Sequence, residues 1–230
     1  MTDNAVVYSS KAEKYERLVA REDYQHNIEA ALLKIRDLHG LDLLDSGAGT
    51  GRLAIMLAPL ARTIQAYDVS AEMLNVAIAR FKAGGFQHWR AEVADHRSLP
   101  VADASVDVVT SGWSVVYTVV WYPETWRAEL ARALDELERV LRPGGTLIIL
   151  ETMGTGETSP NPPADLLEYF KYLEEDGFSS TWIRTDYKFT SLEEARDLSS
   201  FFFGEEMIKK VISMDPTILP ECTGIWWKTF

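Results

Sequence analysis

The first two thirds of the chain alternate between short apolar runs and longer amphipathic stretches. The predicted strands cover residues 41–46, 63–68, 87–93, 105–111 and 146–151, and the last is apolar throughout, as expected when helices cover both faces of a sheet. The stretches between them have helical spacing and cover residues 52–61, 71–82 and 124–141. This repeated order predicts a parallel, doubly wound sheet that binds its ligands at the carboxyl ends of the strands.

Helical spacing also precedes this core, over residues 10–39. Ser10 and Glu13 have the form of a capping box, the charged residues 21–23 favour a division into two helices, and Gly40 is expected to end the segment.

The C-terminal part begins with a loop over residues 153–163, which are rich in Gly, Pro, Ser and Thr. The elements expected after it are a helix over 164–175, a strand over 182–189, a helix from Ser191 toward Phe203, a short helix from 207 to 211 and a strand over 224–230. No repeat or linker interrupts the chain, so we expect one domain, residues 1–230. It divides into a helical cap (1–39), a ligand-binding core (40–152), and a lid with the final strands (153–230).

A glycine-rich turn follows the first strand, where the sequence reads LDLLDSGAGTG at positions 41–51. Glycine at alternate positions 47, 49 and 51 allows a tight reversal with the backbone open to a ligand. The dinucleotide pattern G-x-G-x-x-G would need glycine at position 52, which is Arg52. Asp68 ends the next strand, where nucleotide-binding folds place the acid that accepts ribose hydroxyls. We favour this role over capping of the following helix.

Four elements together resemble the class I S-adenosylmethionine-dependent methyltransferases, nearest the UbiE-like (methyltransferase type 11) small-molecule group. They are the glycine turn ending in Arg52, Asp68, the segment VADHRSLPVADASVDVV around Asp95, and the turn with Pro143-Gly144-Gly145 before the fifth strand. The resemblance covers residues 41–151. It implies a Rossmann-like, seven-stranded, mostly parallel α/β sheet, with N-terminal helices and a C-terminal helical insertion as a lid.

The resemblance further implies S-adenosylmethionine as the cofactor, S-adenosylhomocysteine as the product, and no metal. The methyl group would pass to an O, N or C nucleophile of a small molecule by in-line displacement. Asp95 is expected to meet the adenine amino group, and His96 to lie beside adenine through its backbone rather than to act as a base. The full predicted cofactor set is Asp45, Gly47, Ala48, Gly49, Asp68, Val69, Met73, Ala94, Asp95, His96 and Ser111.

Residues for the methyl acceptor are less distinctive. Trp113, Tyr117 and Trp121 recur at helical spacing, and we favour a place in the core over the wall of a pocket. The residues expected to contact the substrate are Tyr15, Trp113, Tyr117 and Arg184. The candidates for a catalytic role are His96, Tyr117 and Tyr24, and the wider set for acceptor contact or proton removal adds His26 and Glu151. The N-terminal helices and residues 153–215 are expected to form the substrate lid.

The amino-acid composition disfavours several classes of binding partner. The 23 basic and 35 acidic side chains give a net charge of −12, which disfavours nucleic acid and anionic membranes. Cys222 is the only cysteine, which excludes an intramolecular disulfide and a multi-cysteine metal site. The start lacks a signal-peptide pattern, and no run of about 18 apolar residues occurs. We therefore expect a cytoplasmic protein with a small-molecule partner, and its oligomeric state stays open.

Two other functions remain. A protein that binds S-adenosylmethionine without catalysis would show the same core. An NAD(P)-linked oxidoreductase is disfavoured by Arg52 in place of the last glycine.

Overall fold

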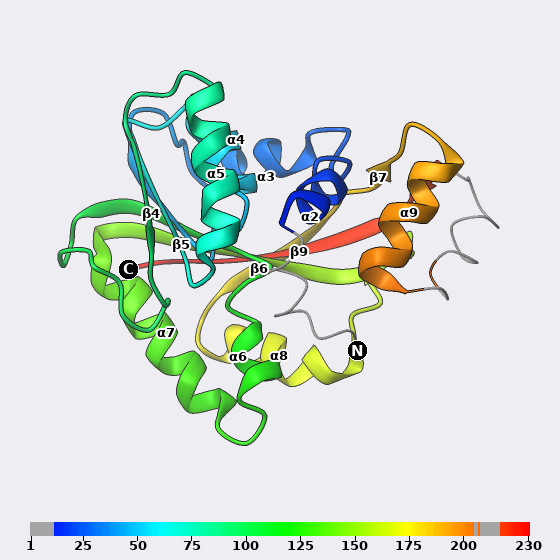
Figure 1. Ribbon diagram of the computed structural model, residues 1–230. Helices are drawn as coiled ribbons and strands as arrows, with labels where there is room; N and C mark the ends of the chain where they lie inside the picture. Colours follow the sequence, from blue (N-terminus) through cyan, green and yellow to red (C-terminus); the bar gives the residue numbers. More distant parts are fainter. Residues whose placement is uncertain (1–11, 205–206, 208–216) are drawn as a thin grey trace.

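The computed structural model describes residues 12–204, 207 and 217–230, and a seven-stranded sheet forms its centre (Figure 1). The strands of this sheet are β1 (Asp42–Ser46), β2 (Thr63–Asp68), β3 (Trp89–Val93), β4 (Val106–Gly112), β5 (Leu141–Thr155), β6 (Ser179–Arg184) and β9 (Glu221–Thr229). Their order is β3-β2-β1-β4-β5-β9-β6, and β9 runs antiparallel to both of its neighbours while the pairs from β3 to β5 are parallel. The predicted seven-stranded, mostly parallel sheet is confirmed.

Helices cover both faces of the sheet, with α4 and α5 on one side and α7 and α8 on the other (Figure 1). The described helices are α2 (Ala12–Val19), α3 (Asn27–Ile35), α4 (Arg52–Leu57), α5 (Ala71–Ala83), α6 (Tyr117–Trp121), α7 (Trp126–Val140), the 3-10 turn η1 (Ala164–Leu166), α8 (Leu167–Glu175) and α9 (Leu192–Phe203). None of these helices has the length and apolar character needed to cross a membrane.

Consecutive residues of the central strands pack into two separate cores, because side chains alternate between the faces of a strand. Leu43 and Val108 belong to the core under α3, α4 and α5. Leu44 and Val109, the next residues along, belong to the core under α7 and α8. Burial on both faces explains why these strands read as unbroken apolar runs in the sequence.

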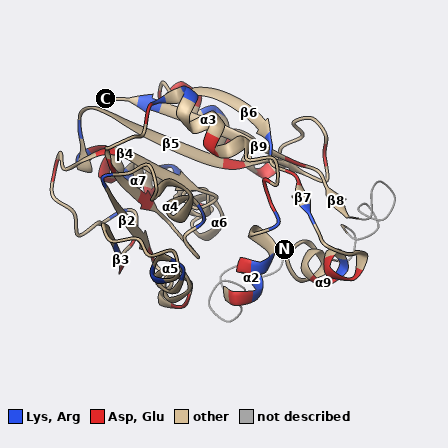
Figure 2. Cartoon of the chain, turned by 90° about the horizontal axis from the view of Figure 1, so that it is seen from above, with Lys and Arg blue, Asp and Glu red and all other residues tan. Residues whose placement is uncertain are grey.

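A third apolar cluster lies beside the sheet and joins the two ends of the chain. Its buried members are Leu18, Tyr187, Phe189, Ala195, Leu198 and Leu219. They come from α2, from α9, and from a small antiparallel sheet of β7 (Tyr187–Lys188) and β8 (Ile218–Leu219) together with the residue that follows β7. Helices α2 and α9 lie side by side (Figure 2), and the ion pairs Lys14–Asp197 (2.5 Å) and Arg21–Glu194 (2.8 Å) link the two ends of the chain.

Several predicted boundaries need correction. The strand predicted over residues 182–189 is two strands in different sheets, β6 and β7. Thr185 and Asp186 separate them: the Thr185 hydroxyl bonds Glu22 and Thr223, and the Asp186 carboxylate accepts from the Glu221 amide. Strand β5 extends to Thr155 by pairing with β9, so the loop begins later than residue 153.

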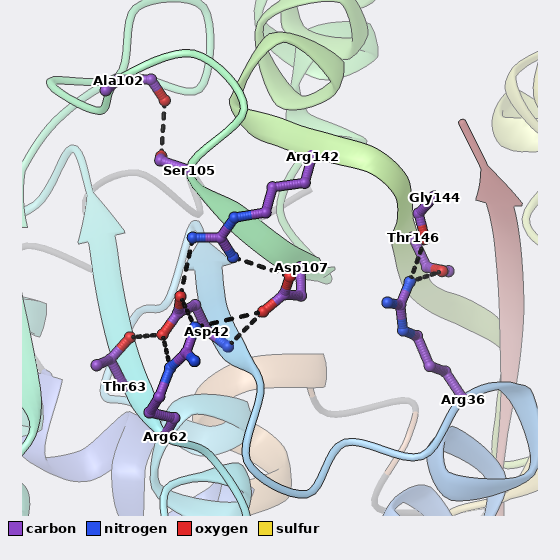
Figure 3. Close-up of polar contacts among 10 residues, drawn as sticks. All are labelled: Arg36, Asp42, Arg62, Thr63, Ala102, Ser105, Asp107, Arg142, Gly144 and Thr146. Atoms are coloured by element: carbon purple, nitrogen blue, oxygen red, sulfur yellow. Dashed lines mark hydrogen bonds and ion pairs between the residues drawn. The ribbon is translucent and has the colours of Figure 1, made fainter.

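The N-terminal helical segment is divided as predicted, into α2 and α3, but its end differs. Helix α3 ends at Ile35 rather than at Gly40, and Arg36 is extended. The Arg36 guanidinium donates to the Gly144 carbonyl (2.6 Å) and to the Thr146 hydroxyl (2.8 Å), as Figure 3 shows. The capping residue Ser10 and most of the helix predicted over 207–211 lie outside the described residues.

A charged network lies at the amino ends of the central strands, at the opposite edge from the glycine turn (Figure 3). Asp42 accepts hydrogen bonds from both Arg62 and Thr63 and pairs with Arg142 at 3.0 Å. Arg142 also pairs with Asp107 at 2.8 Å. The network therefore ties together the starts of β1, β2, β4 and β5.

Candidate functional site

The glycine turn after β1 is closed by backbone hydrogen bonds and has no room for side chains. The amides of Gly47 and Ala48 both donate to the carbonyl of Tyr67 in β2, at 2.7 and 2.8 Å. Gly47 has a φ of +74°, and a Cβ at this position would lie 1.5 Å from the Ser114 Oγ. The turn thus brings bare backbone to the carboxyl edge of the sheet, where a ligand can approach closely.

Asp45 supports this turn from beneath. Its buried carboxylate accepts hydrogen bonds from the Thr110 hydroxyl (2.9 Å) and from the Ala54 amide in the first turn of α4 (3.1 Å). Burial raises the pKa of Asp45 to about 7, with a further contribution from the charge of Asp68. These bonds link β1, β4 and α4, so Asp45 holds the shape of the turn.

Asp68 ends β2 with its carboxylate beside the turn. One oxygen accepts from the Gly49 amide (2.8 Å) and the other from the Ser70 amide (2.8 Å). Burial raises the pKa of Asp68, and these backbone N–H groups oppose the rise. Each oxygen retains a second lone pair, so the carboxylate can also accept hydroxyl groups of a ligand.

A pocket of about 300 Å³, the turn pocket, opens over this edge of the sheet. Nine of the eleven predicted cofactor residues line it: Asp45, Gly47, Ala48, Gly49, Asp68, Val69, Met73, Ala94 and His96. They come from the ends of β1 and β2, from the start of α5 and from the loop after β3. The motifs, which are separate in the sequence, thus form one continuous surface. Its exposed backbone and the Asp68 carboxylate fit a nucleoside cofactor.

Asp95 and Ser111 do not line the turn pocket. The Asp95 carboxylate accepts hydrogen bonds from the backbone and the guanidinium of Arg97 (2.6–2.8 Å), which lower its pKa to about 2. Ser111 is fully buried within β4. The pocket surface after β4 is formed instead by Gly112, Trp113 and Ser114.

His96 lines the turn pocket. The residue is half-buried, and its Nδ1 lies 3.3 Å from the Ser46 Oγ. Burial lowers the pKa of His96 to about 4, so the imidazole is neutral at pH 7.

A second cavity of about 460 Å³, the lid cavity, adjoins the turn pocket. Both are lined by Tyr15, Arg52, Trp113 and Tyr117. The other walls of the lid cavity come from α2, α6, β5, the η1 region, β7, α9 and the start of β9. Of the residues predicted for the acceptor, Tyr15, Trp113, Tyr117 and Glu151 line it.

The sequence favoured a place in the core for the three aromatic residues after β4, and this prediction needs correction. Trp113 precedes α6 in a left-handed conformation (φ +50°), so it is not on the same helix as the other two. Tyr117 and Trp121 stack at 5.1 Å, and Trp121 is 42% exposed. All three line the turn pocket, which makes them part of its wall.

Three other candidates lie away from both cavities. Arg184 forms an ion pair with Asp186 (2.7 Å) at the turn between β6 and β7, and it lines neither cavity. Tyr24 is partly exposed under the ammonium group of Lys188, and His26 lies in the turn before α3. None of the three lines either cavity.

Sequence patterns missed the polar residues that the lid cavity buries. Arg52 donates to Glu22 (2.7 Å) and stacks on the Trp113 ring at 4.0 Å from its centroid. Glu221, at the start of β9, is only 2% exposed. Neither acid belongs to a motif, and isolated glutamates in a sequence are mostly solvent-exposed. Within the described ranges, no group of three or more His, Cys, Asp or Glu side chains is arranged to hold a metal ion.

Comparison with known proteins identifies residues 44–149 with a family model described as a methyltransferase domain. A malonyl-[acyl-carrier protein] O-methyltransferase from Pectobacterium atrosepticum is 36% identical over 129 residues, which cover 56% of this chain and 45% of that protein. A demethylmenaquinone methyltransferase from Chlorobaculum parvum is 30% identical over 166 residues, covering 69% of this chain and 61% of that protein. The chain spans about half the length of the curated relatives it matches.

The fold also matches solved structures. A SAM-dependent methyltransferase from Aquifex aeolicus superimposes with a TM-score of 0.56 at 18% identity, covering 98% of this chain and 93% of that one. At this identity the likeness concerns the fold.

Proposed function

Because residues 44–149 match a family model described as a methyltransferase domain and the matched relatives are named methyltransferases, we propose that this chain is a class I S-adenosylmethionine-dependent methyltransferase that transfers a methyl group to a small molecule. S-adenosylmethionine binds in the turn pocket, and the acceptor binds in the lid cavity. The observation that carries this proposal is the common wall of the two cavities, formed by Tyr15, Arg52, Trp113 and Tyr117. Two adjoining sites are what a transfer between two bound molecules requires.

The cofactor is held by the nine predicted residues that line the turn pocket. Asp68 accepts the ribose hydroxyls, the glycine turn meets the methionine part through its backbone, and Ala94 and His96 lie on the adenine side. The geometry that supports this arrangement is the Asp68 carboxylate beside the Gly49 amide and the close packing of Gly47 against Ser114, which leaves no room for a Cβ.

The bound cofactor supplies an electrophilic methyl group on a positively charged sulfur. The residues of the chain therefore mainly align the acceptor and exclude water. A base is needed only where the attacking atom carries a proton of high pKa. The buried carboxylates of Glu151 and Glu221 in the lid cavity are better placed for this task than Tyr24 or His26, which line neither cavity.

Different segments of the chain bind the cofactor and the acceptor. Residues 40–152 form the cofactor-binding core. The described parts of residues 1–39 and 153–230 form the acceptor lid, because α2, α9 and the start of β9 supply much of the lid-cavity wall. All belong to one domain.

Calorimetry tests the cofactor assignment directly. We expect S-adenosylmethionine and S-adenosylhomocysteine to bind at one site per chain, and NADPH to give no heat of binding. Binding of NADPH in place of S-adenosylhomocysteine would contradict the proposal. Binding of S-adenosylmethionine without methyl transfer to any member of an acceptor panel would favour a non-catalytic binding protein.

A further inference from the structure

Acidic residues outnumber basic residues in the lining of the lid cavity. Four carboxyl groups, Glu22, Glu151, Asp165 and Glu221, face one guanidinium, Arg52. Arg52 already donates to Glu22 at 2.7 Å. The pairing leaves Glu151, Asp165 and Glu221 without a cationic partner among the residues that line the cavity, so an anionic ligand would find no free cation there.

Glu221 is the least satisfied of these acids. One carboxylate oxygen accepts from the Thr152 hydroxyl (2.6 Å), while the other is buried without a hydrogen-bond partner. Such a group is costly to bury unless a ligand completes its bonding. By contrast, Glu151 accepts from the Val116 amide (3.3 Å) and the Tyr169 hydroxyl (3.2 Å).

Aromatic rings make up much of the remaining wall. Six of them line the lid cavity: Tyr15, Trp113, Tyr117, Tyr187, Phe202 and Phe203. The electron-rich faces of such rings attract alkylammonium groups, and their apolar bodies bury hydrocarbon. Acids and aromatic rings around one cavity are thus the two features that recognise an organic cation.

We propose that the lid cavity takes an amine as methyl acceptor, carried as an ammonium group on an apolar or aromatic body, with Glu221 as its anchor. The inference rests on the proposed function, since it concerns the acceptor side of the same reaction. It narrows the O, N or C nucleophile expected from the sequence to nitrogen.

The transfer balances without a further reagent. The ammonium group gives one proton to the Glu221 carboxylate, and its nitrogen gains a lone pair. That lone pair forms the new bond to the methyl carbon, while the carbon–sulfur bond breaks and leaves its electron pair on sulfur. The products are the methylated ammonium ion, S-adenosylhomocysteine and a protonated Glu221.

The surroundings of Glu221 predict a second measurable effect of amine binding, the release of a proton. Burial raises the pKa of Glu221 to about 8, Glu22 adds to the rise, and Thr152, Thr155 and the charge of Arg52 oppose it. At pH 7 the carboxyl group without ligand is therefore mostly protonated. Docking of a cation favours the ionised form, so binding should release a proton.

Three probes of similar shape separate the classes of acceptor: 2-phenylethylamine (cation), 2-phenylethanol (neutral) and 3-phenylpropanoate (anion). Calorimetry at pH 7 with saturating S-adenosylhomocysteine measures their affinities. We expect the amine to bind at least about tenfold more tightly than the alcohol, and the anion to bind most weakly. Repeating the amine titration in phosphate and in Tris, which differ in ionisation enthalpy, should reveal the released proton.

Glu221→Gln removes the charge but keeps an acceptor for Thr152. It should bring the amine and the alcohol to within about threefold of each other and abolish proton release. Glu168→Gln is the matched control, because Glu168 is exposed, pairs with Arg127 and lies outside the cavity. It should leave both readouts unchanged.

The outcomes distinguish the two proposals. Loss of S-adenosylhomocysteine binding in the unaltered protein would refute the proposed function itself. Intact S-adenosylhomocysteine binding with equal affinity for amine and alcohol, tighter binding of the anion, or no binding of the amine would overturn only the amine inference. These comparisons use the unaltered protein, so they hold even where Glu221→Gln fails to fold.

Discussion

Gly47 and Gly40 have nearly the same backbone conformation but different surroundings. Their φ angles are +74° and +71°, both in the left-handed region that favours glycine. A Cβ on Gly47 would collide with Ser114, whereas a Cβ on Gly40 would meet nothing within 4 Å. Substituting each glycine by alanine therefore separates two effects. Both variants carry the backbone strain of alanine at a positive φ, but only the Gly47 variant adds a clash at the turn pocket.

We expect Gly47→Ala to weaken S-adenosylhomocysteine binding by at least about tenfold, since the clash must displace Ser114 or the turn. Gly40→Ala should cost about 1–2 kcal/mol of stability from its φ alone and leave the affinity unchanged. Calorimetry and urea unfolding measure the two effects. Equal affinities in both variants would show that the turn does not contact the cofactor.

Asp68→Ala should reduce S-adenosylhomocysteine affinity by about 1–3 kcal/mol, because ribose hydroxyls would lose their acceptor in a buried site. The change also removes the acceptor for the Gly49 and Ser70 amides. Asp68→Asn keeps one carbonyl acceptor and should lose less. Unaltered calorimetric affinity in both variants would contradict the ribose role.

Among the elements, α9 links the amino-terminal helix α2 to the acceptor site. Tyr15 of α2 contacts Phe202 of α9 with ring centroids 5.6 Å apart, and both side chains line the lid cavity. The helix begins at a side-chain cap, where the Ser191 Oγ accepts from the Glu194 amide (3.1 Å). Its stability should therefore affect the acceptor site more than the turn pocket.

Ser191→Ala removes this cap and should cost about 1 kcal/mol of unfolding free energy. The amine probe should bind more weakly, while S-adenosylhomocysteine should bind as before. Ser200→Ala makes the same chemical change inside α9 at an exposed position and should stay within about 0.5 kcal/mol of the unaltered protein. A larger loss for Ser200→Ala than for Ser191→Ala in urea unfolding would contradict the role of the cap.

At the scale of the whole molecule, the Asp42 network fastens four strands at the edge opposite the site. The Arg62 guanidinium, with burial opposing it and with Thr63 and Arg142 assisting, holds the pKa of Asp42 well below its usual range. A carboxylate whose pKa is lowered in the folded state stabilises the protein above its unfolded pKa of about 3.9. That contribution is lost as the pH falls toward the folded value.

Asp42→Asn should therefore lower the unfolding free energy by about 1–3 kcal/mol at pH 7, with the difference from the unaltered protein shrinking below about pH 4. Asp37→Asn is the control. The pKa of Asp37 is also lowered, through hydrogen bonds from His39, but the group is exposed, and we expect no measurable change. A difference for Asp42→Asn that stays constant down to pH 2 would contradict the electrostatic origin.

The sequence by itself determined the sheet, both helical layers and the class of cofactor. These depend on neighbours in the chain: strands buried on both faces require apolar runs, and a turn with a φ of +74° favours glycine at position 47. Local sequence patterns also placed Asp68 at the end of β2 and identified most of the residues that line the turn pocket. The cofactor roles of these individual residues remain predictions.

Only the tertiary structure decided the lid cavity. Its walls come from segments between Tyr15 and Glu221 that share no periodic signal, and its polar residues are buried only because those segments meet. Whether a charged side chain is solvated, paired or left for a ligand depends on residues distant in the chain, and that information lies in the packing rather than in any local pattern.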